Sequence, residues 1–258
     1  MTDMTIAQAL DVPIVVFVAS LAVQCLATYA GYLLRPRGRP IEETRVSDLD
    51  IVHGAALTLL ALVIGFTFTM AVTRYDQRKN YEEDEANHIG TEYSRITLLS
   101  LNDTNAVKSL IKDYTFQRIQ FYRTRDSSKL DNIEETTEIL QKKLWASVSG
   151  PASAKPTPVN ALAVSGMNDV IDSAGFTNAA WRNRVPSAAW IFLEIIALIC
   201  NMLLGYRFKE RSIVILLLFP LITSLSFFVI SDIDNPRQGI IQVIPQNLIL
   251  EAKAMKSQ

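Results

Sequence analysis

Four apolar blocks, each about as long as a membrane-spanning helix, dominate this sequence. A helix of ~20 residues crosses the ~30 Å hydrocarbon core of a bilayer. It can do so because it satisfies its own backbone hydrogen bonds where no water is present. The blocks cover residues 12–34, 54–73, 187–206 and 212–231. We therefore expect an integral membrane protein with four transmembrane helices.

The first block is expected to be a permanent span and not a secretion signal. Asp3 and Asp11 are the only charged residues before it, so the basic stretch that opens a signal peptide is missing. Its apolar run from Val12 to Leu34 is also longer than the roughly 7–15 residues of a signal core.

Short basic connectors predict that the spans pair as two hairpins. Residues 35–40 join the first two spans and residues 207–211 join the last two, and both connectors are rich in Lys and Arg. The positive-inside rule would place these connectors in the cytoplasm. Basic residues also flank the opposite ends of the spans, namely Arg74, Arg78, Lys79, Arg182 and Arg184. We expect a multi-pass protein of the cell membrane, the inner membrane if the source is a bacterium, and its orientation stays open.

The predicted organisation is a transmembrane hairpin at residues 1–73, a soluble helical domain at 74–186, a second hairpin at 187–231 and a tail at 232–258. Acidic and basic residues are equal in number between Arg74 and Pro186, so the soluble domain is neutral. Neither Pro nor Gly occurs between Gly65 and Gly90, which predicts that the second span continues as one helix to about Leu101. The predicted fold class is an all-α membrane protein.

Further helices are expected in the soluble domain. A polar break at residues 102–105 precedes a helix that ends near Arg125. Asp131 is expected to cap the next helix, and Gly150 with Pro151 to end it. A fourth helical segment leads to Pro186, and a short extended piece is expected at residues 240–243.

The composition excludes several classes of function. A formal net charge of −1 gives no reason to expect a nucleic-acid partner. Cys25 and Cys200 lie inside apolar blocks, where they are expected to be small buried hydrophobes. The sequence contains no Ser-centred elbow, phosphate loop or His-rich metal motif, so we expect that the chain is not an enzyme.

Glu194 and Asn201 lie seven residues apart in the third span, on one helix face. A carboxylate in hydrocarbon needs a partner or water, so such residues are candidates for function. One interpretation is a polar site in a pore or between helices. The other is that Glu194 reaches the interface or pairs with Arg182 or Arg184.

An acidic run at residues 82–85 is interpreted as a solvated helix face. Glu85, His88 and Glu92 share helical spacing, which is also compatible with a metal site. After the last span, Asp232 and Asp234 are candidate ligands for a hard cation such as Ca²⁺. The alternative is that these acids cap the end of the span. No other cofactor is expected.

The second span resembles the second membrane helix of bestrophins, which are pentameric anion channels. It reads Leu-Val-Ile-Gly-Phe-Thr-Phe-Thr-Met-Ala-Val-Thr-Arg-Tyr over residues 62–75. The whole chain resembles the bacterial bestrophin-like family more closely. That resemblance rests on the segment from Gly65 through residues 85–91, on Asp232-x-Asp234-x-Pro236-x-x-Gly239, and on the placement of the spans.

The resemblance implies that the neck of a pore falls on Thr58, Leu62 and Phe66. Packing between helices is the alternative for this stripe. It also implies a homo-oligomer, a pentamer by analogy, that conducts small ions, anions among them. This chain departs from bestrophins in two ways. Bestrophins have a longer acidic calcium cluster after the last span, where only Asp232 and Asp234 could correspond here. Their soluble part is cytosolic, whereas the basic connectors of this chain favour the opposite orientation. The rival hypothesis is a non-conducting membrane scaffold or signalling protein whose helical domain binds a partner.

Overall fold

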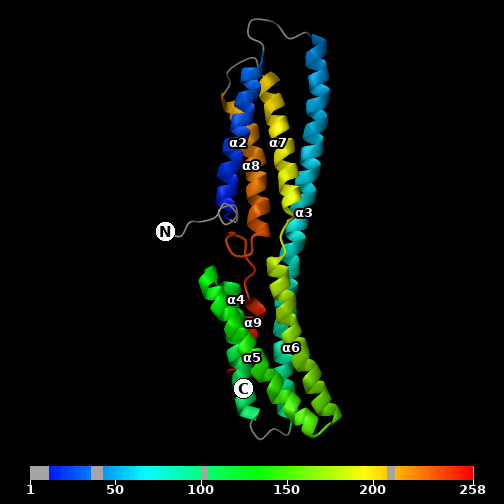
Figure 1. Ribbon diagram of the computed structural model, residues 1–258, viewed down its shortest axis with the longest axis vertical. Coiled ribbons are helices and arrows are strands. Elements are labelled where there is room, and N and C mark those ends of the chain that lie inside the picture. Colours follow the sequence, from blue (N-terminus) through cyan, green and yellow to red (C-terminus); the bar gives the residue numbers. More distant parts are fainter. Residues whose placement is uncertain (1–11, 36–42, 100–103, 208–212, 258) are drawn as a thin grey trace. The chain divides into compact units, whose positions relative to one another are not determined.

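The computed structural model describes residues 12–35, 43–99, 104–207 and 213–257, and within these ranges it contains helices and no strand (Figure 1). The helices are α2 (Pro13–Leu34), α3 (Glu43–Arg95), α4 (Thr104–Arg123), α5 (Ser127–Ala154), α6 (Pro158–Arg182), α7 (Ser187–Arg207), α8 (Ile213–Asp234) and α9 (Gln246–Ala254), with a 3-10 turn η1 (Ile96–Leu98). Four stretches are long and apolar enough to cross a membrane, and they lie in α2, in α3, in the segment formed by α6 and α7, and in α8. The predicted all-α membrane fold is confirmed.

The chain divides into two compact units. The membrane unit lies within Met1–Arg74 and Arg184–Ile241, and the soluble unit within Tyr75–Asn183 and Gln242–Gln258. The segment predicted as a separate tail is therefore shared: its first part belongs to the membrane unit, and its last part forms α9 of the soluble unit.

In the membrane unit, α2 packs along both α7 and α8 (Figure 1). Two glycines permit close contact between α2 and α7. A Cβ on Gly31 would lie 1.9 Å from the Met202 carbonyl oxygen, and one on Gly205 would lie 1.9 Å from that of Thr28. Only glycine allows backbones to approach so closely. An apolar core completes the unit, with Leu60, Leu193, Ile196, Ala197, Cys200 and Phe227 buried.

The soluble unit consists of the second part of α3 with α4, α5, α6 and α9. Helix α5 packs against α4 and α6, and α9 packs against α4. Aliphatic and aromatic side chains from all of these helices form one core, which includes Ile89, Ile96, Tyr114, Phe121, Leu144, Met167 and Leu248. The predicted continuation of the second span is confirmed, since α3 runs unbroken to Arg95 and η1 follows it.

Two local predictions were wrong. Asp126, not Asp131, caps α5, because its carboxylate accepts hydrogen bonds from both the backbone N–H and the hydroxyl of Ser128. Helix α5 continues past Pro151 to Ala154, and the Pro151 carbonyl oxygen accepts the backbone N–H of Lys155 at 3.0 Å. Residues 240–243, predicted as a short extended piece, form neither a strand nor a helix.

Candidate ion pathway and polar sites

The exposed face of α3 carries the three residues predicted to line a pore. Leu62 is 51% exposed, Phe66 is 63% exposed, and Thr58 is also exposed. Buried on the same helix are Leu60, Thr67 and Ala71. At about 100° per residue, these buried residues lie about 160° around the helix from the centre of the stripe.

Two further threonines extend this stripe beyond the prediction. Thr69 and Thr73 are exposed and lie on the same side of α3 as Phe66. The hydroxyls of Thr58, Thr69 and Thr73 each donate to a carbonyl oxygen one turn earlier, at 2.9 Å. The stripe is thus polar at both ends and apolar in the middle. Only 17% of the residues in the most apolar stretch of α3 are buried, so lipid, water or another chain must cover the others.

Asn201 lies in a buried polar cluster that ties three helices of the membrane unit together. Its amide group donates to Gln24 Oε1 at 3.3 Å and accepts from the Thr28 hydroxyl at 3.2 Å. The Thr223 hydroxyl of α8 also donates to Gln24 Oε1. Buried hydrogen bonds of this kind fix the packing of membrane helices. The geometry therefore matches the interpretation of a polar site between helices.

Gln24 is the centre of that cluster, and the sequence interpretation overlooked it. It is the one side-chain amide in the first span, a signal that was available. Gln24 also interacts with Glu194, which together with Asn201 was predicted to form a polar site in the membrane. Arg182, a suggested partner for Glu194, instead forms an ion pair with Glu134 in the soluble unit, at 3.6 Å.

The motif Asp232-x-Asp234-x-Pro236-x-x-Gly239 forms a compact turn at the end of α8. The Asp232 carboxylate accepts the backbone N–H groups of Ile240 and Ile241 at 2.6 and 2.9 Å. Both oxygens of Asp234 accept the N–H of Val185, at 3.1 and 3.0 Å. A Cβ on Gly239 would lie 2.2 Å from the Asp232 carbonyl oxygen, which explains the glycine.

These contacts bear on the predicted cation site. Both carboxylates face backbone N–H donors, which a cation would have to displace. Within the described ranges, His, Cys, Asp and Glu form no group of three that would hold a metal ion. The two carboxylates hold the backbone of neighbouring loop residues, and both the capping role and calcium at this turn stay predictions.

Two charged side chains of α3 cap other helices of the soluble unit. Arg78 is 1% exposed and donates to the carbonyl oxygens of Ala180 and Asn183 at the end of α6, at 3.1 and 3.0 Å. Glu82 accepts the N–H of Leu248 at 3.0 Å, in the first turn of α9. The pKa of Glu82 is raised, because burial outweighs the Leu248 N–H and the Asn247 amide, which lower it. Each charge has the sign that the helix end favours.

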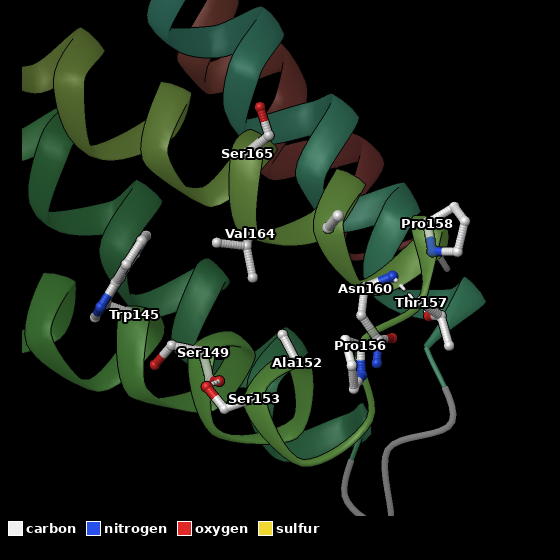
Figure 2. Close-up of a pocket in the computed structure, with 11 residues that line it drawn as sticks. Trp145, Ser149, Ala152, Ser153, Pro156, Thr157, Pro158, Asn160, Val164 and Ser165 are labelled. Atoms are coloured by element: carbon white, nitrogen blue, oxygen red, sulfur yellow. Dashed lines mark hydrogen bonds between the residues drawn. The ribbon is translucent and has the colours of Figure 1, made fainter.

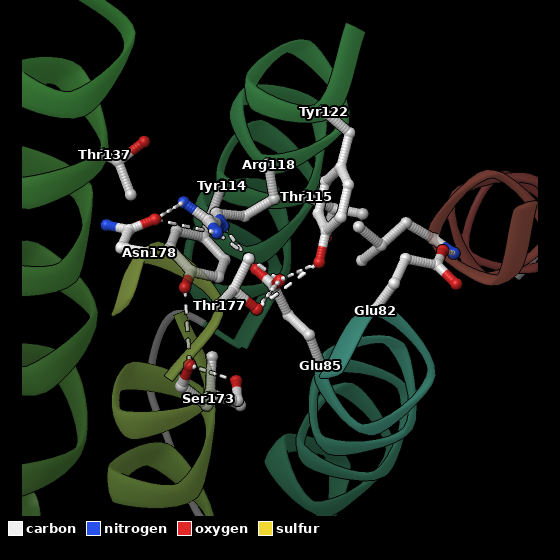
Figure 3. Close-up of polar contacts among 12 residues, drawn as sticks. Glu82, Glu85, Tyr114, Thr115, Arg118, Tyr122, Thr137, Ser173, Thr177 and Asn178 are labelled. Atoms are coloured by element: carbon white, nitrogen blue, oxygen red, sulfur yellow. Dashed lines mark hydrogen bonds and ion pairs between the residues drawn. The ribbon is translucent and has the colours of Figure 1, made fainter. Parts of the chain in front are cut away.

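A buried ion pair joins α3 to α4 (Figure 3). Arg118 and Glu85 are both fully buried, and the Arg118 Nε donates to Glu85. The hydroxyls of Tyr122 and Thr177 each donate to Glu85 Oε2 at 3.1 Å. Burial lowers the pKa of Arg118, but the Glu85 carboxylate outweighs it, so the pKa is raised. Burial raises the pKa of Tyr122, and the adjacent carboxylate adds to this.

The acidic run is therefore only half solvated, and its interpretation as a solvated face was wrong for Glu82 and Glu85. Both are buried, whereas Glu83 and Asp84 are exposed. His88 is also exposed, so it does not share the buried position of Glu85 and Glu92 that a joint metal site would need. The buried residues lie on the face of α3 that other helices of the soluble unit cover, and the exposed residues lie on the face that these helices leave open.

A hollow of about 760 Å³ lies where α5 and α6 meet (Figure 2). Trp145 lines one side of it, and the rest is lined by serines and alanines of both helices together with Val164, Asn160 and the loop between the helices. Trp145 is 39% exposed, which leaves part of a large apolar ring open to solvent. Such a surface is a candidate for contact with another protein.

Comparison with known proteins identifies the family. The family described as "Bestrophin-like domain" matches residues 17–248 of this chain. The chain belongs to the bestrophin-like family. The match covers both units of this bestrophin-like chain, from α2 to α9, so the resemblance inferred from the sequence is confirmed.

Solved structures show the same fold. A variant of a bacterial bestrophin homologue from Klebsiella pneumoniae superimposes with a TM-score of 0.63 at 12% identity, covering 94% of this chain and 99% of that chain. A second variant gives 0.63 at 13% identity, covering 94% and 97%. A further structure of the homologue gives 0.62 at 13% identity, covering 95% and 98%. No curated protein matches the chain.

Proposed function

We propose that this bestrophin-like chain forms a homo-oligomeric ion channel of the cell membrane, in which α3 of each subunit lines a central pathway. The observation that carries the proposal is the exposed stripe of α3, opposite the face that packs into its own subunit. A stripe on one helix cannot enclose a path by itself. Several copies around an axis would place the stripes face to face.

The order of side chains along the stripe suits a gated pathway. Leu62 and Phe66 would form adjacent apolar rings, and apolar constrictions of this kind gate by dewetting. The threonines at 58, 69 and 73 flank those rings with hydroxyl groups that can contact a hydrated ion. By analogy with bestrophins we propose a pentamer that selects anions. No catalytic step is part of the proposal.

The test is ion flux through purified protein in liposomes, with Phe66→Ala compared against Phe68→Ala. Phe68 is a matched control because it lies on the same helix and is 42% exposed, but on a different side. Removing the Phe66 ring widens and wets the neck. We expect flux to rise about tenfold, which corresponds to ~1.4 kcal/mol removed from the barrier. Phe68→Ala should leave flux within about twofold of the wild type, far short of that change.

Two results would end the proposal. One is an absence of chloride, potassium and sodium flux at every pH tested, with and without calcium. The other is a monomer or simple dimer in nanodiscs, because neither arrangement provides a ring of α3 helices. Chloride-to-potassium permeability, measured on the conducting protein, decides anion selectivity separately.

A second candidate function is a scaffold whose soluble unit binds a partner. The hollow beside Trp145 favours it, because the exposed ring and surrounding hydroxyls offer a docking surface (Figure 2). If the protein conducts no ion and Trp145→Ala abolishes co-purification of a partner, the scaffold replaces the channel. Ion conduction by the purified protein without any partner would make the scaffold hypothesis unnecessary.

A further inference from the structure

A cavity of about 640 Å³ lies inside the membrane unit, between α2, α7 and α8. Its size falls within the ~300–1,000 Å³ range of small-molecule sites. Apolar side chains form most of its wall, among them Val16, Val23, Trp190, Ile191 and Phe227. No residue of α3 lines it. The cavity is therefore separate from the exposed stripe of α3.

The Glu194 carboxylate lines this cavity, and the Gln24 amide lies beside that carboxylate. The Glu194 side chain lines the wall, and its Oε1 is buried with no hydrogen-bond partner among the described residues. The nearest donor is Gln24 Nε2, which is close enough to interact with the Glu194 carboxylate but forms no hydrogen bond with it. A buried polar atom without a partner costs about 1–3 kcal/mol. The protein would be stabilised by a ligand that donates a hydrogen bond to Glu194.

The charges around the cavity specify the sign of that ligand. Arg184, Asp234 and Glu194 are its three charged lining residues. One cation and two carboxylates leave a net negative lining, which repels anions. Asp234 is already held by the Val185 N–H, so Glu194 is the carboxylate of the lining with capacity to accept a further hydrogen bond.

We propose that this cavity binds an amphipathic amine, with its amine head donating to Glu194 and its alkyl tail against the apolar wall. A charge-assisted hydrogen bond to the carboxylate is about twice as strong as a neutral one, which favours an amine over an alcohol of the same length. The site goes beyond the proposed channel, because it lies within one subunit and requires neither conduction nor oligomerisation.

The test uses Trp190 as a reporter in nanodisc-embedded protein. We would titrate 11-bromoundecylamine, whose bromine quenches indole fluorescence, and compare it with 11-bromoundecanol. Trp145 and Trp181 lie in the soluble unit and contribute a constant signal. We expect saturable quenching by the amine, with an affinity about tenfold higher than that of the alcohol.

Two variants and one control separate the site from simple partitioning. Glu194→Gln should reduce the preference for the amine to about twofold, since the charge-assisted bond is lost. Ala19→Phe, which fills the cavity and keeps Glu194, should abolish saturable quenching by both compounds. Glu83→Gln, at an exposed carboxylate of the soluble unit, should behave like the wild type. Elution volume and melting temperature confirm that each variant is folded.

Non-saturable quenching of equal strength by amine and alcohol would overturn the proposal and indicate a cavity filled by water or lipid. Saturable binding with the same amine preference in Glu194→Gln would overturn the role of the carboxylate. Loss of ion flux in the same protein would affect the proposed channel only, because the quenching experiment measures binding in the absence of any ion gradient.

Discussion

The carboxyl group of Glu92 lies at the contact between α3 and α6, and its ionisation should control the stability of the soluble unit. Glu92 is 1% exposed, and neither of its oxygens has a hydrogen bond within the described ranges. The nearest cation, Arg95 Nη1, is 3.7 Å from Oε2. Burial raises the pKa of Glu92 from 4.5 to about 7, against the opposing effect of Arg95. Asp169 adds to the rise.

The direction of the pH effect follows from this rise. The folded state holds the proton on Glu92 up to about pH 7, whereas the unfolded state releases it near 4.5. The stabilisation is therefore complete below about pH 4.5 and is lost as the pH increases through about 7. A rise in the pKa from 4.5 to about 7 corresponds to roughly 3 kcal/mol, most of which should disappear between about pH 5 and 8.

Hydrogen exchange measures this effect locally in the intact protein. Peptides covering Glu92 and the facing segment around Gly166 should lose most of this ~3 kcal/mol of opening free energy between about pH 5 and 8, after correction for the intrinsic rate. Glu92→Gln cannot ionise and should make that free energy independent of pH. Glu83→Gln, at an exposed position of the same helix, should keep the wild-type slope. A flat wild-type profile, or an unchanged slope in Glu92→Gln, would refute the reasoning.

Three other substitutions test the remaining contacts. Arg118→Met should lower the melting temperature of the soluble unit, at a cost of ~3–5 kcal/mol for the stranded Glu85 carboxylate, and adding Glu85→Leu should restore part of the loss. Gly239→Ala should destabilise the membrane unit by ~1–3 kcal/mol in an SDS titration, because its Cβ meets a carbonyl oxygen at 2.2 Å. Gly54→Ala, with nothing within 4 Å, is its control and should change little. Asn201→Leu should cost ~0.6–1.7 kcal/mol in the same titration, and an unchanged midpoint would contradict the interhelical role of its amide.

The membrane helices and the length of α3 were predictable from the sequence because both follow from local signals. An apolar block of sufficient length has few alternatives to a spanning helix. The absence of Pro and Gly between Gly65 and Gly90 correctly predicted an unbroken helix. The exposed stripe at Thr58, Leu62 and Phe66 came from the resemblance, and whether it lines a pathway stays a prediction.

The role of the acidic run was not predictable in the same way. Helical spacing shows which side chains share a face, but not which face another helix will cover. Glu82 and Glu85 are buried because α9 and α4 pack on their side of α3, and residues distant in sequence supply the donors. Gln24 was missed for a similar reason: its partners, Asn201 and Thr223, come from the far end of the chain.

The continuity of α3 restricts how its length can change. The helix carries the exposed stripe and, further along, the three side chains that bind α6, α9 and α4: Arg78, Glu82 and Glu85. Inserting one residue between Arg78 and Glu82 would turn Glu82 and Glu85 by about 100° relative to Arg78. Inserting seven would leave an error of only ~20°. Related chains are therefore expected to keep the spacing of Arg78, Glu82 and Glu85 within the soluble unit.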